Sequence, residues 1–209
     1  LMLTSKDHAL FATVGGAPSG MAFDSAGNLY VSNSGNNTIE RFTPGGVGSS
    51  FVSANSNPVG LAFDNAGNLY VANQTYSTIQ KFTPEGTGSI FVNTRLNSTS
   101  GIAFDGAGNH DVGNQGDNTI YSFTTGGTGT LFANTDLDVI VGLAFDGAGN
   151  PYAANVGNDT TTKITPGGVT SLFANSLNDP RFIAIAGSAV PEPATYSVLA
   201  GLTVGAMAW

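Results

Sequence analysis

Short apolar runs recur along the chain and alternate with stretches rich in Gly, Asn, Ser, Thr and Pro. Within residues 60–100 the apolar runs read GLAFD, LYVAN, TIQKFT and SIFVNT, and turn-like stretches such as NAGN and PEGTG separate them. Short runs of this kind between Gly, Pro and Asn clusters are typical of β-strands, and the 3.6-residue period of an amphipathic helix is absent. The pattern therefore predicts four antiparallel strands in this stretch.

The same pattern occurs four times. The phrase G-[MLI]-A-F-D-x-A-G-N begins at Gly20, Gly60, Gly101 and Gly142. Self-similarity at a fixed period of about 40 residues is typical of propellers and solenoids. The first strand of each copy alternates large residues with alanine, as in Leu61, Ala62 and Phe63, so both of its faces are apolar. A strand packed between two sheets needs such faces, and we predict an all-β fold, a β-propeller of four-stranded antiparallel blades.

The repeat boundaries divide the chain into blades and flanking segments. We predict repeats at residues 20–59, 60–100, 101–141 and 142–181, and the first strand of a further blade at 182–187. Residues 1–19 contain ALFATV, which matches a fourth strand, so we expect a partial blade there. A propeller commonly completes one blade with strands from both ends of the array. Because four complete blades and a split one leave that blade unfinished, we expect the chain to be a fragment of a larger ring.

Charge and cysteine content narrow the partners and the chemistry. Six Lys and Arg residues against fourteen Asp and Glu residues give a net charge of −8, and there is no cysteine. A field of this sign repels phosphate backbones, so we do not expect a nucleic acid partner. The lack of cysteine excludes disulfides, thiolate metal sites and cysteine nucleophiles.

The repeat consensus, GLAFDxAGNLYVANxxxxTIxKFTPxGxxxxFV, resembles the NHL-type repeat of six-bladed propellers. These repeats are related to the propellers of gluconolactonase and strictosidine synthase. The resemblance covers residues 9–187 and implies a propeller fold. It implies little about activity, because propellers host lyases, lactonases and binding modules alike.

Residues 188–209 differ in kind from the repeats. Val190, Pro191, Glu192 and Pro193 precede an uncharged apolar segment at 196–209, which we expect to be helical and which is shorter than the ~20 residues that span a bilayer. This arrangement resembles the PEP-CTERM sorting signal of Gram-negative bacteria, although no basic cluster ends it. The resemblance implies recognition by an exosortase, transient insertion into the inner membrane, and delivery to the periplasm, cell surface or extracellular matrix beside exopolysaccharide. The alternative is an apolar chain end or a docking helix.

Few residues suggest metal binding or catalysis. His8 and His110 are the only histidines and occupy non-equivalent repeat positions, so they cannot form a histidine zinc site. His110 and Asp111 replace the Leu-Tyr of LYVAN, which we interpret as drift within one blade, the alternative being an acid–base pair. A recurring aspartate precedes each x-A-G-N turn, and we assign it to turn closure rather than to calcium binding. These aspartates are Asp24, Asp64, Asp105 and Asp146.

One asparagine ends the second predicted strand of every copy, and polar loops follow it. These residues are Asn33, Asn73, Asn114 and Asn155. Their face of the propeller is our candidate ligand surface, since amides and hydroxyls suit sugars or peptide backbone, although such side chains also satisfy loop backbone. We expect an exported, non-enzymatic binding module for extracellular polysaccharide or surface proteins, without catalytic residues, metal or cofactor. The alternative is a gluconolactonase-like or lyase-like enzyme with a divalent metal in the central channel.

Overall fold

The computed structural model describes residues 2–4 and 10–185. Its first blade consists of β3 (Pro18–Phe23), β4 (Leu29–Asn33), β5 (Thr38–Phe42) and β6 (Gly48–Ser53). The second blade consists of β7 (Pro58–Phe63), β8 (Leu69–Asn73), β9 (Thr78–Phe82) and β10 (Gly88–Val92). The third consists of β11 (Thr99–Phe104), β12 (His110–Asn114), β13 (Thr119–Phe123) and β14 (Gly129–Ala133). The fourth consists of β15 (Ile140–Phe145), β16 (Pro151–Asn155), β17 (Thr160–Ile164) and β18 (Thr170–Ala174).

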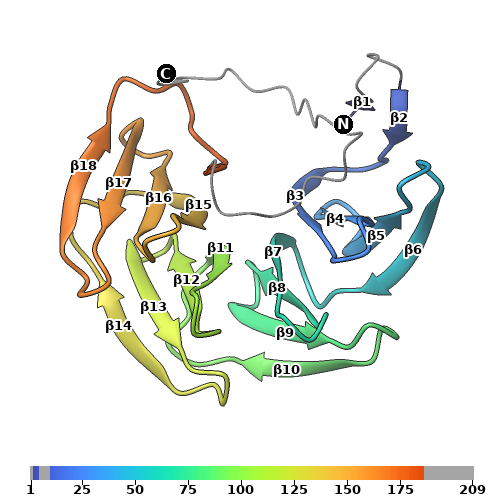
Figure 1. Cartoon of the computed structure of the whole chain (residues 1–209), viewed down its shortest axis with the longest axis horizontal. Coiled ribbons are helices and arrows are strands. Elements are labelled where there is room, and N and C mark those ends of the chain that lie inside the picture. Colours follow the sequence, from blue (N-terminus) through green and yellow to red (C-terminus); the bar gives the residue numbers. More distant parts are fainter. Residues whose placement is uncertain (1, 5–9, 186–209) are drawn as a thin grey trace.

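Each blade is a four-stranded antiparallel meander in which sequence neighbours pair. Figure 1 shows the four sheets arranged around a common centre, with the first strand of each innermost and the fourth outermost. The predicted all-β propeller of four-stranded blades is therefore confirmed. The described residues contain no helix, so none that could cross a membrane.

The second strands form the centre of the packing between blades. All five residues of β4, β8, β12 and β16 are buried. Tyr30 of the first blade, for example, packs edge-on against Phe51 of its own blade and Phe63 of the next, with ring centroids 5.0 and 4.9 Å apart. Tyr70 and Phe104 make a similar contact between the second and third blades, and aliphatic side chains such as Ile120 and Ile140 join the third blade to the fourth.

The glycine that opens the repeat phrase permits the closest approach between inner strands. A Cβ atom added at Gly20 would collide with the carbonyl oxygen of Val59, and one at Gly60 would collide with that of Ser100. The tightest contact between neighbouring inner strands therefore lies at this glycine. Only a residue without a side chain allows two inner strands to meet at this distance.

The aspartate of each repeat closes the turn between the first and second strands, as predicted. Asp64 Oδ1 accepts hydrogen bonds from the backbone N–H groups of Ala66 at 3.0 Å and Asn68 at 2.8 Å, while Oδ2 accepts one from Asn68 Nδ2 at 2.7 Å. Gly67 adopts φ +81° in the same turn, which favours glycine. The other three copies repeat these backbone bonds.

The four blades are flanked by two incomplete pieces. At one end β1 (Met2–Thr4) pairs with β2 (Leu10–Thr13), and Val14 then packs into the core of the first blade. At the other end residues 180–185 belong to no strand, and residues 186 and 187 of the first strand predicted at 182–187 lie outside the described residues. They nevertheless lie beside β15, because a Cβ on Gly142 would approach Arg181 O to 2.8 Å. A first strand needs a second strand to pair with, and none is described beside these residues.

Candidate functional site

Two kinds of loop meet on one face of the propeller, which we call the loop face. The first kind joins the second and third strands of each blade, at residues 34–37, 74–77, 115–118 and 156–159. The second kind leads from one blade into the next, as at residues 54–57, 93–98 and 134–139. Backbone hydrogen bonds link the two kinds, such as Ala54 N to Asn37 O at 2.8 Å and Gln74 N to Asn57 O at 3.0 Å.

The four predicted asparagines lie beneath this face and are fully buried. Three of them hold the loop that leads into their own blade, whereas Asn73 Nδ2 donates to Thr78 Oγ1 and Gln80 Oε1 on the third strand. Asn114 Oδ1 accepts a hydrogen bond from Asn97 N at 3.1 Å, and Asn155 Oδ1 accepts one from Asp138 N at 3.3 Å. Asn33 does the same for its own loop. A ligand on the loop face therefore meets the loops above these asparagines before it meets the asparagines themselves.

Three side-chain amides form a hydrogen-bonded row across the loop face. Asn57 Nδ2 donates to Gln74 Oε1 at 2.7 Å, and Gln74 Nε2 donates to Gln115 Oε1 at 2.6 Å. This amide row connects the loop entering the second blade with the second and third blades. All its bonds run in one direction, so an amide oxygen on Asn57 lies at one end and an amide nitrogen on Gln115 at the other. Such ends can accept from and donate to the hydroxyl groups of a ligand.

An exposed aromatic residue lies in the same turn as the middle residue of the amide row. Tyr76 occupies the same turn as Gln74, closed by the hydrogen bond from Ser77 N to Gln74 O at 3.2 Å, and its side chain is 64% exposed. The corresponding positions in the other blades are Asn36, Asp117 and Asn158. Tyrosine offers a flat apolar ring and a polar hydroxyl at little conformational cost, which suits a ligand with both apolar and hydroxylated surfaces.

Acidic residues outnumber basic ones on the loop face, where Arg95 is also exposed. Asp117, Asp136, Asp159 and Asp179 are exposed on its loops. Arg181 lies beside one of them, with Nε 2.8 Å from Asp179 Oδ2. Carboxylates on this side of the molecule disfavour a polyanionic ligand and leave neutral or cationic ligands.

His110 and Asp111 do not form an acid–base pair. They are successive residues of β12, so their side chains point to opposite faces of the sheet. The His110 ring is buried among Tyr70, Phe91 and Phe104, with centroids 4.3 to 4.6 Å away. This burial lowers the pKa of the imidazole. The residue fills a core position, in agreement with our interpretation of drift.

Asp111 belongs to a pair of neighbouring positions at which the third blade differs from the second. The equivalent Tyr70 lies under Lys81, whose Nζ is 5.2 Å from the ring centroid and 3.8 Å from Asp64. In the third blade Asp111 replaces the tyrosine and Ser122 replaces the lysine, and the two are hydrogen-bonded. Burial raises the pKa of the Asp111 carboxyl to about 6. The carboxyl is closed off from solvent and cannot reach a substrate.

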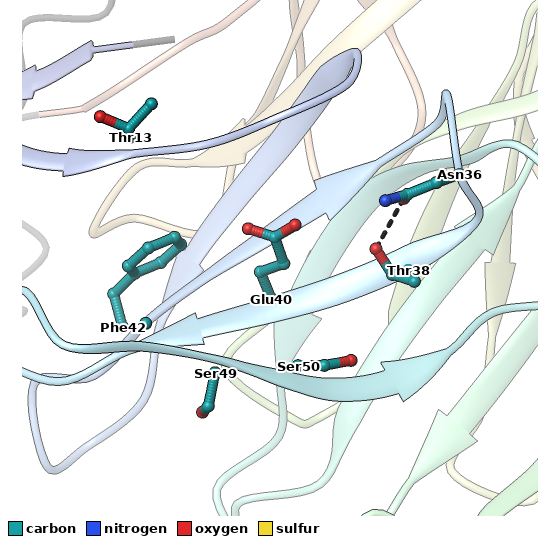
Figure 2. A pocket seen from close by; sticks show the side chains of 8 residues that line it. Thr13, Asn36, Thr38, Glu40, Phe42, Ser49 and Ser50 are labelled. Carbon is teal, nitrogen blue, oxygen red and sulfur yellow. Dashed lines mark hydrogen bonds between the residues drawn. The ribbon is translucent and has the colours of Figure 1, made fainter.

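A pocket opens at the side of the first blade, where β2 lies against β5 and β6. It has a volume of about 410 Å³. Thr13, Asn36, Thr38, Glu40, Phe42, Gly48, Ser49 and Ser50 line it. Figure 2 shows Glu40 projecting from β5 into the space below Thr13, with Phe42 beside it. This pocket was not among the sites predicted from the sequence. Its one available signal was a glutamate at a third-strand position where the other copies have Gln80, Tyr121 and Thr162.

No group of three or more His, Asp or Glu side chains converges as a metal site within residues 2–4 and 10–185. The four turn aspartates hold their own loops, as described above. The predicted sorting motif, Val190, Pro191, Glu192 and Pro193, lies outside the described residues, as does His8.

Solved structures of other proteins share this architecture. A chain of a nidogen/laminin complex matches with a TM-score of 0.74 and 20% identity, over 81% of this chain and 69% of that one. A structure described as a gluconolactonase matches with a TM-score of 0.69 and 20% identity, over 82% and 68%. Virginiamycin B lyase from Staphylococcus aureus matches with a TM-score of 0.66 and 15% identity, over 84% and 59%. No protein-family model and no curated protein sequence matches the chain.

These matches show a propeller fold related to those of lactonase-like and lyase proteins. The chain spans between half and two thirds of the length of the lyase structures. Our expectation of a non-enzymatic protein is corrected by this comparison, because enzymes are among the structures that the chain resembles. At 14–20% identity the likeness shows the fold and assigns no reaction.

Proposed function

We propose that this protein is an exported β-propeller that binds extracellular polysaccharide on its loop face. The observation that carries the proposal is the amide row of Asn57, Gln74 and Gln115. Its two bonds, at 2.7 and 2.6 Å, hold the side chains of three successive loops in place before any ligand arrives. Groups fixed in advance lose little entropy on binding, which favours affinity.

The chemistry of the row fits the hydroxyl groups of a sugar. A sugar hydroxyl both donates and accepts, and the row offers an acceptor at Asn57 and a donor at Gln115. The exposed ring of Tyr76 adds an apolar surface next to the row. The exposed aspartates on the same face and the net charge of −8 favour a neutral polysaccharide over an acidic one. Binding of this kind would serve a binding module and an enzyme of this fold equally.

The export half of the proposal depends on the tail. Its support is the resemblance of residues 190–193 and the apolar segment after them to an exosortase sorting signal. The proposed address is the periplasm, the cell surface or the extracellular matrix of a Gram-negative bacterium, with an exosortase as the processing partner.

The binding half is tested by cosedimentation of the purified protein with insoluble neutral polysaccharides, such as cellulose and curdlan, and by affinity electrophoresis in soluble dextran and in alginate. We expect retention by at least one neutral polymer and weaker retention by alginate. Retention should fall about tenfold in Gln74→Ala, a loss of ~1.4 kcal/mol. The proposal would be contradicted if none of the neutral polymers retained the protein, or if the Gln74→Ala variant bound as tightly as the wild type.

A further inference from the structure

We propose that the side pocket around Glu40 binds an organic ammonium group, at a site separate from the loop face. The pocket lies between β2 and the outer strands of the first blade and has a volume of about 410 Å³. This volume falls in the range of small-molecule sites.

The Glu40 carboxylate has no positively charged partner among the described residues. Glu40 is half-buried, and its one hydrogen bond within the described part of the chain comes from Asn33 Nδ2 at the long distance of 3.4 Å. The salt bridges among the described residues involve Lys81, Lys163 and Arg181, and none of them reaches Glu40. A carboxylate that is partly removed from water without a positive partner costs free energy, and a bound cation would offset that cost.

In two other blades the side chain at the position equivalent to Glu40 forms hydrogen bonds within the protein. In the second blade Gln80 Oε1 accepts hydrogen bonds from Asn55 N at 2.8 Å and from Asn73 Nδ2 at 3.0 Å. In the fourth blade Thr162 Oγ1 donates to Asp136 O at 2.6 Å. Both side chains are neutral and are used internally to hold the loop entering their blade. Glu40 carries a charge and projects into the pocket (Figure 2).

The remaining lining decides which kind of cation fits. Thr38 Oγ1 donates to Asn36 Oδ1 at 2.6 Å, which leaves the lone pairs of the Thr38 hydroxyl to accept from a ligand. Ser50 and Thr13 also line the pocket, and Phe42 contributes an aromatic ring. One carboxylate with scattered hydroxyls does not supply the six or more converging oxygens that calcium requires. An ammonium group needs only a few acceptors and also interacts with an aromatic ring.

The same ammonium group can belong to a free amine or to an amino sugar, and the experiment separates the two sources. Isothermal titration calorimetry on the wild-type chain uses three ligands: spermidine, the glucosamine hexamer and the N-acetylglucosamine hexamer. The last is the uncharged counterpart of the glucosamine hexamer. Two variants remove one negative charge each: Glu40→Gln inside the pocket and Glu85→Gln in the exposed turn between β9 and β10. The second variant controls for the general attraction of cations to a protein of charge −8.

The proposal predicts that spermidine or the glucosamine hexamer binds and that the N-acetylated hexamer does not bind at this pocket. Affinity should fall about tenfold in Glu40→Gln, as expected for a lost charge-assisted contact of ~1.4 kcal/mol, and less than about twofold in Glu85→Gln. Binding of spermidine as well as the hexamer identifies the bare ammonium as sufficient. Equal losses in the two variants, or no amine binding at all, would overturn the proposal. Because Gln74 and Gln115 lie elsewhere, Gln74→Ala should leave amine binding unchanged, which keeps this test separate from that of the loop face.

Discussion

Gln74 Nε2 donates a 2.6 Å hydrogen bond to Gln115 Oε1 in the next blade, although the two residues are one repeat apart in sequence. This hydrogen bond crosses the boundary between the second and third blades on the loop face. The contact exists only because both copies have glutamine immediately after the buried asparagine, where the first copy has Ser34 and the fourth has Val156. It is therefore a local departure from the repeat, and departures are where a repeat protein can carry a specific function.

The first prediction concerns the stability of the amide row. Gln74→Ala removes two side-chain hydrogen bonds, each with a net worth of ~0.5–1.5 kcal/mol, from a half-buried position. We expect the free energy of unfolding, measured with urea, to fall by about 1–2 kcal/mol while the circular dichroism spectrum keeps its β-sheet form. Thr75→Ala, in the same turn at an exposed position, is the matched control and should change the free energy by less than about 0.5 kcal/mol. Equal effects of the two substitutions would show that the row contributes nothing to the fold.

The second prediction concerns the inner strands. Gly60→Ala places a methyl group against the carbonyl oxygen of Ser100 in the next blade, and backbone on both sides leaves no room for it. Overpacking of this kind costs about 3 kcal/mol, so the midpoint of urea unfolding should fall clearly. Gly106→Ala is the control, since a Cβ there meets nothing within 4 Å and other copies have Ser25 and Asn65 at this position. A Gly60→Ala variant as stable as Gly106→Ala would mean that the blades are spaced more widely than described.

The third prediction is a pH dependence caused by Asp111. Its carboxyl has a pKa of about 6 in the folded protein, above the model-peptide value of 3.8, because burial disfavours the charged form. A raised carboxyl pKa means that the folded state holds the proton more tightly, so the contribution of Asp111 to stability is greatest below pH 4 and is lost as pH rises from about 4 to 6. The full effect is about 3 kcal/mol.

The isosteric variant Asp111→Asn isolates this contribution. Urea unfolding at pH 4, 5, 6 and 7 should show Asp111→Asn gaining stability relative to the wild type as pH rises, by up to about 3 kcal/mol. His110 is unchanged in both proteins, so its lowered pKa cancels in the comparison. A difference between the two proteins that stays constant with pH would rule out a buried, titrating Asp111.

The fourth prediction concerns the tail. Replacement of Pro191, Glu192 and Pro193 by alanine should leave the protein unprocessed and retained at the inner membrane in a host that has an exosortase. Fractionation and immunoblotting measure both outcomes, and Glu85→Gln is the control with one exposed carboxylate removed from the propeller. If the triple variant is exported and cleaved like the wild type, the tail is not a sorting signal of this kind.

The architecture was predictable because the same strand-and-turn pattern occurs in four copies. Turn residues such as Asp64 and Gly67 act within their own loop, so local sequence contains the whole cause of the structure there. The closest approach of the inner strands was harder, because the clash at Gly60 involves the backbone of Ser100 in the following blade. The strand predicted at 182–187 rests on its sequence pattern, and it stays a prediction, because a strand also depends on a pairing partner that the pattern does not contain.

The candidate site was less predictable than the fold. The asparagines were singled out because they recur in every copy, yet all four are buried, and Asn33, Asn114 and Asn155 bind the loops that enter their own blades. The amide row and the Glu40 pocket depend on residues that differ between copies. Whether these residues form a site depends on which side chains lie next to one another in the folded protein, and the repeat period alone does not predict those contacts.

The most direct test of the loop face is an NMR titration of the chain, labelled with ¹⁵N, with a soluble neutral oligosaccharide derived from the polymer that the protein retains. The side-chain amide signals of Gln74 and Gln115 are the probes, and those of Asn68 and Asn109, in turns on the opposite face, are the controls. We predict that the two glutamine signals shift with increasing ligand while the two asparagine signals stay in place. Shifts confined to Asn68 and Asn109, or no shift at any of the four, would contradict binding at the loop face.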